Sequence, residues 1–218
     1  MVAGIAVIVD SVLNASRVSV LQAMRDTLEN VSLKEMLTTE LRQQLVGGVF
    51  GNEVLLNETN AINKKLLDMP QLKASYIMAA DYSAVGVFIK HRLRTKGSSY
   101  KSVYASLVTP NVEGLAVSKK DNQQFWLDNP EALKESLQKG VKEAVALFVA
   151  DYNDTHPKKR ATELVDQIVT PYPELFYNMK VLSEENGKVV LMGNSQKHLG
   201  YLSTPEHMVG ERVKLSLD

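Results

Sequence analysis

The residues with the clearest capacity for chemistry are positively charged and close together in the sequence. Lysines and arginines gather between positions 90 and 101, beside Tyr100 and Tyr104: Lys90, Arg92, Arg94, Lys96 and Lys101. Cationic side chains interleaved with aromatic rings are typical of surfaces that bind a phosphate backbone or an anionic lipid layer. The other interpretation, which the sequence alone favours, is a sheet edge kept soluble by its charges.

A second candidate is Asp10, which follows a short apolar run. In α/β enzymes a carboxylate at the end of a strand can serve catalysis or bind a metal ion, although aspartate is also a common turn former. The histidines are scattered at His91, His156, His198 and His207, without the spacing of a metal-binding pair. We therefore predict no catalytic residue, no metal site and no cofactor, and keep an enzyme or nucleotide-binding site near Asp10 as an alternative.

The composition sets further bounds on function. The 218 residues include 44% hydrophobic and 23% charged side chains, and the 25 basic and 25 acidic residues give no net charge. A neutral chain argues against a dedicated nucleic-acid binder. The absence of cysteine removes thiol nucleophiles, disulfides and zinc knuckles. The glycine-rich phosphate loops and the partner motifs of serine–lysine enzymes are also missing.

Several elements can be predicted in the first two thirds of the chain. Residues 4 to 10 form an apolar, β-branched run typical of a buried strand. Ser32 and Glu35 form a capping box that opens a helix ending before Gly47. Further helices are expected at 15–29 and 58–69, and strands at 49–56 and 115–118. The alternation from Tyr100 to Val108 predicts a half-buried strand that pairs with residues 75–95 as a hairpin.

The strongest helix signal begins at Asn129 and Pro130. Apolar residues then recur in steps of three and four as far as Tyr152, so that they share one face, which we expect to lie on a sheet. A linker at 154–160 and a short helix at 161–169 follow. Strands are expected at 175–182, 188–192 and 211–217, the first two joined by a type I′ turn at Asn186 and Gly187.

The order of these elements resembles the α/β domain of bacterial envelope lipoproteins. The resemblance rests on the segment Ser32-Leu-Lys-Glu35, the strand at 73–81 and the helix that begins at Asn129, and it covers residues 4 to 152. Such domains occur in the curli-secretion channel subunit, the amino-terminal domain of the Tol-system propeller protein and auxiliary lipoproteins of envelope transport. The resemblance implies a non-catalytic scaffold role through protein contacts. It transfers no site residue, and the lipid-bearing cysteine would lie upstream of this chain.

The sequence thus predicts an α/β (α+β) fold: a mixed sheet of about four to five strands with helices packed on it. Residues 1–155 would form this α/β sandwich, and residues 156–218 a linker, a short helix and a small β-rich C-terminal region. The leading functional interpretation is a periplasmic, outer-membrane-associated assembly protein that binds other envelope proteins or itself. The alternatives are a cytoplasmic protein, the site near Asp10, and a module that binds an anionic partner through the hairpin at 90–104.

Overall fold

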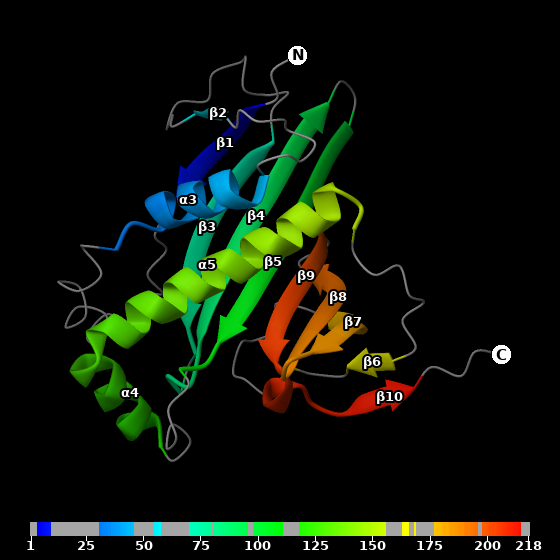
Figure 1. The fold of residues 1–218 in the computed structure, drawn as a ribbon. Helices are drawn as coiled ribbons and strands as arrows, with labels where there is room; N and C mark the ends of the chain where they lie inside the picture. Colours follow the sequence, from blue (N-terminus) through cyan, green and yellow to red (C-terminus); the bar gives the residue numbers. More distant parts are fainter. Residues whose placement is uncertain are drawn as a thin grey trace.

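The fold was analysed in a computed structural model that describes residues 4–9, 31–45, 55–57, 70–79, 81–95, 98–110, 118–155, 163–165, 168, 177–195 and 198–214. One mixed sheet of ten strands runs through this part of the chain, and helices cover one of its faces (Figure 1). The strand order is β10-β6-β7-β8-β9-β5-β4-β3-β1-β2. The predicted α/β class is therefore confirmed.

The first half of the sheet consists of β1 (Gly4–Val9), β2 (Leu55–Asn57), β3 (Gln71–Met78), β4 (Val85–Thr95) and β5 (Ser98–Val108). β1 runs parallel to β2 and β3, whereas β3, β4 and β5 are antiparallel neighbours. The predicted hairpin is confirmed, because β4 and β5 pair from Val85 with Val108 to Thr95 with Ser98. The prediction that the second strand of this hairpin is half-buried is wrong. Every side chain of β5 from Ser102 to Val108 is buried, because β5 is covered on both faces.

The second half consists of β6 (Glu163–Val165), β7 (Tyr177–Glu185), β8 (Lys188–Ser195), β9 (His198–Pro205) and β10 (Arg212–Lys214). Asn186 and Gly187 have φ values of 54° and 71°, as the predicted type I′ turn between β7 and β8 requires. β9 runs parallel to β5, with Tyr201 opposite Tyr104. This pairing joins the two halves, so the sheet has ten strands instead of the four to five expected.

Two helices lie on one face of the first half (Figure 1). α3 (Leu33–Leu45) begins as predicted, with the Oγ of Ser32 accepting a hydrogen bond from the backbone N–H of Glu35 at 3.2 Å. α5 (Pro130–Tyr152) packs on β4, β5 and α3. Its predicted apolar stripe is buried from Leu133 to Phe148. None of the helices in the described ranges is both long and apolar enough to cross a membrane.

A third helix, α4 (Lys119–Asp128), was not predicted. Ser118 is its N-cap, and the Ser118 Oγ accepts a hydrogen bond from the Asp121 N–H at 3.2 Å. The helix is fixed to the turn between β3 and β4 by two side chains. Trp126 Nε1 donates to the Tyr82 carbonyl at 2.7 Å, and Asn122 Nδ2 donates to the Asp81 carbonyl at 2.9 Å.

The short helix predicted at 161–169 is wrong, because Glu163–Val165 forms strand β6. β6 pairs with β7 on one side and β10 on the other, and these long-range hydrogen bonds override the local helical pattern. β10 confirms the last predicted strand. The helices predicted at 15–29 and 58–69, and residue Asp10, lie outside the described residues.

Buried side chains form two clusters on opposite faces of the sheet. One lies between α3, α5 and the sheet and includes Leu37, Ile89 and Phe148. The other lies on the opposite face and joins Phe88 and Leu107 of the first half to Leu191 and Leu202 of the second. A 3-10 turn, η3 (Glu206–Met208), closes this second cluster with Met208.

Candidate binding surface

The charged side chains of the predicted patch divide between the two faces of the sheet. Side chains alternate along a strand, and His91 of β4 and Ser102 of β5 lie on the face that carries α5. Lys90, Arg92 and Lys101 therefore lie on the opposite face. The pairing of Lys73 of β3 with Lys90 adds a fourth cation there. We call this set of residues, Lys73, Lys90, Arg92 and Lys101, the basic face.

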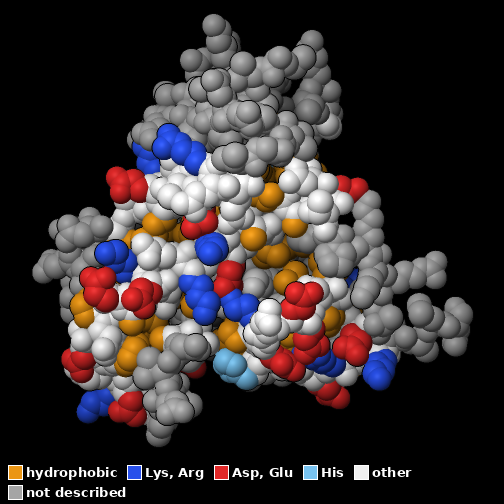
Figure 2. All heavy atoms as spheres, in the orientation of Figure 1, with side chains coloured by type: hydrophobic (Ala, Val, Ile, Leu, Met, Phe, Trp, Pro, Cys, Tyr) orange, Lys and Arg blue, Asp and Glu red, His pale blue; other side chains and the backbone are white. Residues whose placement is uncertain are grey.

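The basic face brings like charges directly opposite one another. Lys73 pairs with Lys90 across β3 and β4, and Arg92 pairs with Lys101 across β4 and β5. Like charges at such cross-strand positions destabilise a sheet. The sequences of β3, β4 and β5 contain no aspartate or glutamate. On the face that carries α5, by contrast, acidic and basic side chains are interspersed (Figure 2).

The sheet-edge interpretation of these charges is wrong for Lys90 and Arg92. Both residues of β4 pair with β3 on one side and β5 on the other, so they protect no open edge. Lys101 lies just before the residues of β5 that pair with β9, Ser102 to Ser106. The sequence could not show this, because the neighbour that covers β5 is β9, almost one hundred residues away in the chain.

The described side chains of the basic face differ in exposure. Lys90 and Lys101 are exposed, and Arg92 is half-buried with its Nε atom buried and without a hydrogen-bond partner. Among the described residues, no carboxylate forms an ion pair with Lys90, Arg92 or Lys101. Arg94 lies on β4, but its side chain is outside the described part, as is Lys96. The structure thus brings together three of the five predicted residues.

The opposite face holds a cluster of potentially catalytic residue types around Asp151, in the last turn of α5. The Asp151 carboxylate accepts hydrogen bonds from the hydroxyls of Tyr104 at 2.5 Å, Tyr201 at 2.7 Å and Tyr100 at 3.2 Å. Burial, followed by these hydrogen bonds, raises the pKa of Tyr104 and Tyr201, so both hydroxyls remain protonated donors. They stabilise a negative charge that the C-terminal end of the helix dipole disfavours.

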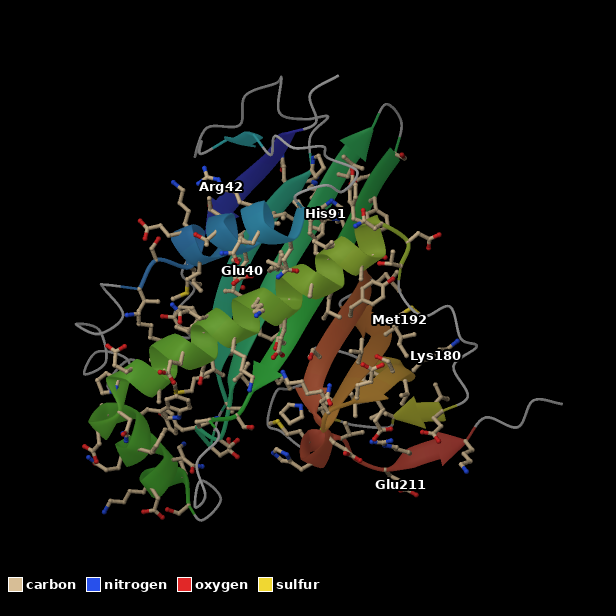
Figure 3. The ribbon with its side chains drawn as sticks, viewed as in Figure 1. Glu40, Arg42, His91, Lys180, Met192 and Glu211 are labelled. Atoms are coloured by element: carbon tan, nitrogen blue, oxygen red, sulfur yellow. The ribbon has the colours of Figure 1, made fainter. Side chains whose placement is uncertain are left out.

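His91 lies near the C-terminal end of α5 (Figure 3). A series of hydrogen bonds leads from Asp151 through Tyr104 and Ser102 to His91. Tyr104 gives its only proton to Asp151, so Ser102 must donate to Tyr104, at 2.8 Å. The Nδ1 of His91, 3.2 Å from the Ser102 Oγ, must then be a donor. Its Nε2 is buried and has no hydrogen-bond partner. Burial lowers the pKa of His91 to about 4, against a smaller opposing effect of Asp151.

A second carboxylate, Glu143, lies two turns earlier on α5. It accepts hydrogen bonds from Ser106 of β5 at 2.6 Å and Ser203 of β9 at 3.3 Å, and these serines are paired across the two strands. Glu143 also forms an ion pair with Lys188. Burial and the charge of Lys139 lower the pKa of Lys188 to about 8, while Glu143 acts in the opposite direction by favouring the ammonium form.

Glu143 and Asp151 therefore have the same role. Each takes hydroxyl donors from both β5 and β9, and together they tie α5 across the junction between the two halves of the sheet. This role could not be predicted from the sequence, because Tyr201 and Ser203 belong to β9, a strand that was not predicted. These hydrogen bonds engage the acidic, serine and tyrosine side chains in holding the fold.

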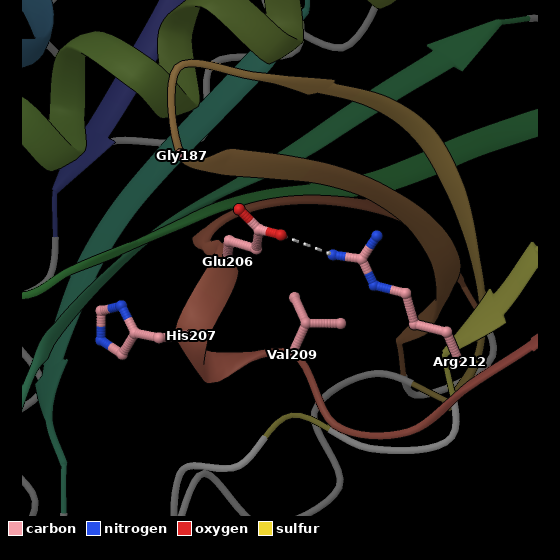
Figure 4. Close-up of a pocket in the computed structure, with 5 residues that line it drawn as sticks. All are labelled: Gly187, Glu206, His207, Val209 and Arg212. Atoms are coloured by element: carbon pink, nitrogen blue, oxygen red, sulfur yellow. Dashed lines mark ion pairs between the residues drawn. The ribbon is translucent and has the colours of Figure 1, made fainter.

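An open hollow of about 580 Å³ lies beside η3 and is lined by Gly187, Glu206, His207, Val209 and Arg212 (Figure 4). Arg212 forms two parallel hydrogen bonds with Glu184, at 2.7 and 3.0 Å. Glu206 and Glu163 lie 3.6 and 3.9 Å from the same guanidinium. No group of three or more histidine, aspartate or glutamate side chains within the described ranges is placed to hold a metal ion.

Comparison with known proteins adds little to this description. No family model matches the chain, and no curated protein matches it. Among solved structures, the chain is similar to a crystal structure of an uncharacterized protein, at 16% sequence identity and a TM-score of 0.24. The similarity covers 47% of this chain and 62% of that chain. A function for the basic face must therefore be inferred from the residues that form it.

Proposed function

We propose that this protein is a non-catalytic binding and assembly protein that holds an anionic partner on its basic face. The observation that carries the proposal is the pairing of Arg92 with Lys101, beside the exposed Lys90, on two strands without an acidic residue. A like-charge pair of this kind opposes folding, and Lys90 and Arg92 protect no edge, because β4 pairs at both positions with β3 and with β5. A bound anionic surface would remove the repulsion and give the arrangement a function.

The partner we propose is a carboxylate-rich protein surface. Three of the four cations are lysines, whose compact charges lack the fork geometry with which arginine recognises phosphate. The chain as a whole is also neutral, whereas nucleic-acid binding depends on extensive phosphate neutralisation. This fits an assembly protein, and the resemblance of its element order to envelope lipoprotein domains supports a place in the bacterial cell envelope.

The binding proposal can be tested with a fluorescently labelled oligo-glutamate peptide. Fluorescence anisotropy should show binding that weakens as salt is raised, and Lys90→Gln with Lys101→Gln should reduce affinity by about tenfold or more. The matched control is Lys120→Gln with Lys142→Gln, which removes two exposed charges from the helices. Equal affinity in the two double variants would refute the proposal. Tighter binding of duplex DNA or of phosphatidylglycerol vesicles would instead assign the basic face to phosphate.

The cellular part of the proposal has a separate test. Fractionation of cells that express the full-length native protein should place it with the periplasm or the membranes, detected by an antibody against this chain. Recovery with the cytosolic marker proteins would contradict the envelope assignment and leave the binding proposal to stand on the peptide measurement.

A further inference from the structure

The C-terminal end of α5 is held on the sheet by contacts that gather around one histidine. We call residues 148–152 the helix end. The ring of Phe148 packs edge-on against His91 and Tyr104, with centroid distances of 5.4 and 5.5 Å. The Asp151 carboxylate accepts the hydrogen bond of the Tyr104 hydroxyl. The position of the helix end therefore depends on the side chains of His91 and Tyr104.

His91 fits this arrangement in its neutral form. The residue is 4% exposed, and its Nδ1 donates to Ser102, which in turn donates to Tyr104. The Nε2 is buried and has no hydrogen-bond partner. Protonation adds a hydrogen at Nε2, and a buried donor without an acceptor is unfavourable, above all when it is charged. The imidazolium can gain a partner if the structure around it opens to water.

The groups that face His91 do little to hold its positive charge. Among the described residues, β5 contributes the hydroxyls of Tyr100 and Tyr104, and α5 contributes Asp151. The residue of β3 that pairs with His91 is the apolar Leu72, and the cations on either side of His91 in β4 point to the opposite face of the sheet. Burial outweighs the attraction of Asp151 and lowers the pKa of His91 to about 4.

We infer that protonation of His91 releases the helix end from the sheet while the rest of the described fold stays in place. The inference does not depend on the proposed function. Release lets water reach the imidazolium, and it breaks the hydrogen bonds that Asp151 accepts from β5 and β9. The hydrogen bonds of Glu143 to the same two strands lie two turns earlier on α5 and are retained. The helix end thus acts as an acid-sensitive latch on the junction between the two halves of the sheet.

The size of the effect follows from the two protonation equilibria. A released His91 has its ordinary pKa of 6.5, whereas the buried one has a pKa of about 4. The latch is therefore fully stable above pH 6.5 and weakens as the pH falls towards 4. Between pH 7 and pH 4.5 the population of the released form should rise about fiftyfold.

Hydrogen exchange of the intact protein, followed by mass spectrometry, tests this inference. Protection factors at pH 7 and pH 4.5 are corrected for the intrinsic exchange rate at each pH. Amides of the helix end should be less protected than those of α3 at both pH values, because they exchange through a local opening. Their protection should fall about fiftyfold at pH 4.5. A fall that is absent, or helix-end amides that are as protected as those of α3, would overturn the inference.

Two histidine variants identify the group that is protonated. In His91→Gln the side-chain amide can still donate to Ser102 but does not titrate, so the fall in protection should disappear. The control is His207→Gln, which removes an exposed histidine of η3 and should leave the fall unchanged. A fall of the same size in His91→Gln would show that another group carries it, and the inference would be wrong.

The wild type also decides the question if His91→Gln does not fold. The protection of the helix end should fall about tenfold for each pH unit between pH 6 and pH 4.5, as expected for the uptake of one proton. Trp126, the single tryptophan of the chain, is buried in α4 next to the start of α5. Acrylamide should quench its fluorescence equally little at pH 7 and pH 4.5. Strong quenching at pH 4.5 would show global unfolding instead of a local release and would overturn the inference.

Discussion

His91 shows how burial fixes the charge state of a single residue in this protein. Its ring lies between Phe148, Tyr100 and Tyr104, with centroid distances of 5.4, 5.6 and 6.4 Å. The loss of water around the ring lowers its pKa, and the negative charge of Asp151 opposes this effect only in part. Burial therefore favours the neutral imidazole. Hydrogen bonds connect His91 to Asp151 through the hydroxyls of Ser102 and Tyr104.

The low pKa of His91 predicts a loss of stability in mild acid. The unfolded chain binds a proton near pH 6.5, whereas the folded protein does so only near pH 4. The contribution of His91 is therefore complete above pH 6.5 and is lost as the pH falls towards 4, by about 2–3 kcal/mol in the free energy of unfolding. Urea unfolding at a series of pH values measures this loss.

The variant His91→Gln provides the comparison, because its amide can donate to Ser102 but cannot be protonated in this range. The difference in unfolding free energy between pH 7 and pH 4 should be smaller in the variant than in the wild type, and the carboxylates that titrate in both proteins cancel. Parallel pH profiles for the two proteins would show that His91 does not carry the acid sensitivity.

At the scale of elements, Gly140 sets how closely α5 approaches the sheet. A Cβ atom at this position would lie 2.6 Å from Cγ2 and 3.1 Å from Cβ of Val87. Glycine is otherwise unfavourable in the middle of a helix. Its presence therefore indicates that contact with β4 is worth more than helix propensity.

The variant Gly140→Ala is predicted to destabilise the protein, although alanine is the better helix former. The methyl group must displace Val87, at a cost of about 1–3 kcal/mol. The control is Gln138→Ala, an exposed position on the same helix, where the change should be neutral or slightly stabilising. Thermal unfolding measures both. A stabilised Gly140→Ala protein would mean that α5 does not lie this close to β4.

Elements with a local signal could be predicted, and those fixed by distant partners could not. The stripe of α5 and the capping box of α3 are encoded within each segment. β9 carries Leu199, Tyr201 and Ser203 on one face and Gly200, Leu202 and Thr204 on the other. Because both faces mix apolar and polar residues, the alternation that marks a half-buried strand is absent.

α4 is a different case, because a local signal did exist. Ser118 followed by Asp121 is a capping pattern, but the helix has few apolar positions and is held by the hydrogen bonds of Trp126 and Asn122 to the β3–β4 turn. The candidate binding surface shows the same difference. Its positive charges could be predicted from the sequence, whereas the position of Lys90 and Arg92 on an interior strand depends on the pairing of β4 with both β3 and β5.

At the scale of the whole molecule, one junction joins the two halves of the sheet. β5 and β9 pair there, and α5 ties the junction together through Glu143 and Asp151, which accept hydrogen bonds from both strands. Lys90, Arg92 and Lys101 lie on β4 and β5, beside this junction. The fold thus presents these cations to a partner from interior strands of the sheet.

Lysine footprinting shows whether Lys90 and Lys101 contact an anionic partner. The protein is acetylated with and without saturating oligo-glutamate peptide, and the modification of each lysine is measured by mass spectrometry. We expect the peptide to protect Lys90 and Lys101, while Lys120 and Lys142 react as before. Protection of Lys120 and Lys142, with Lys90 and Lys101 still fully reactive, would contradict it.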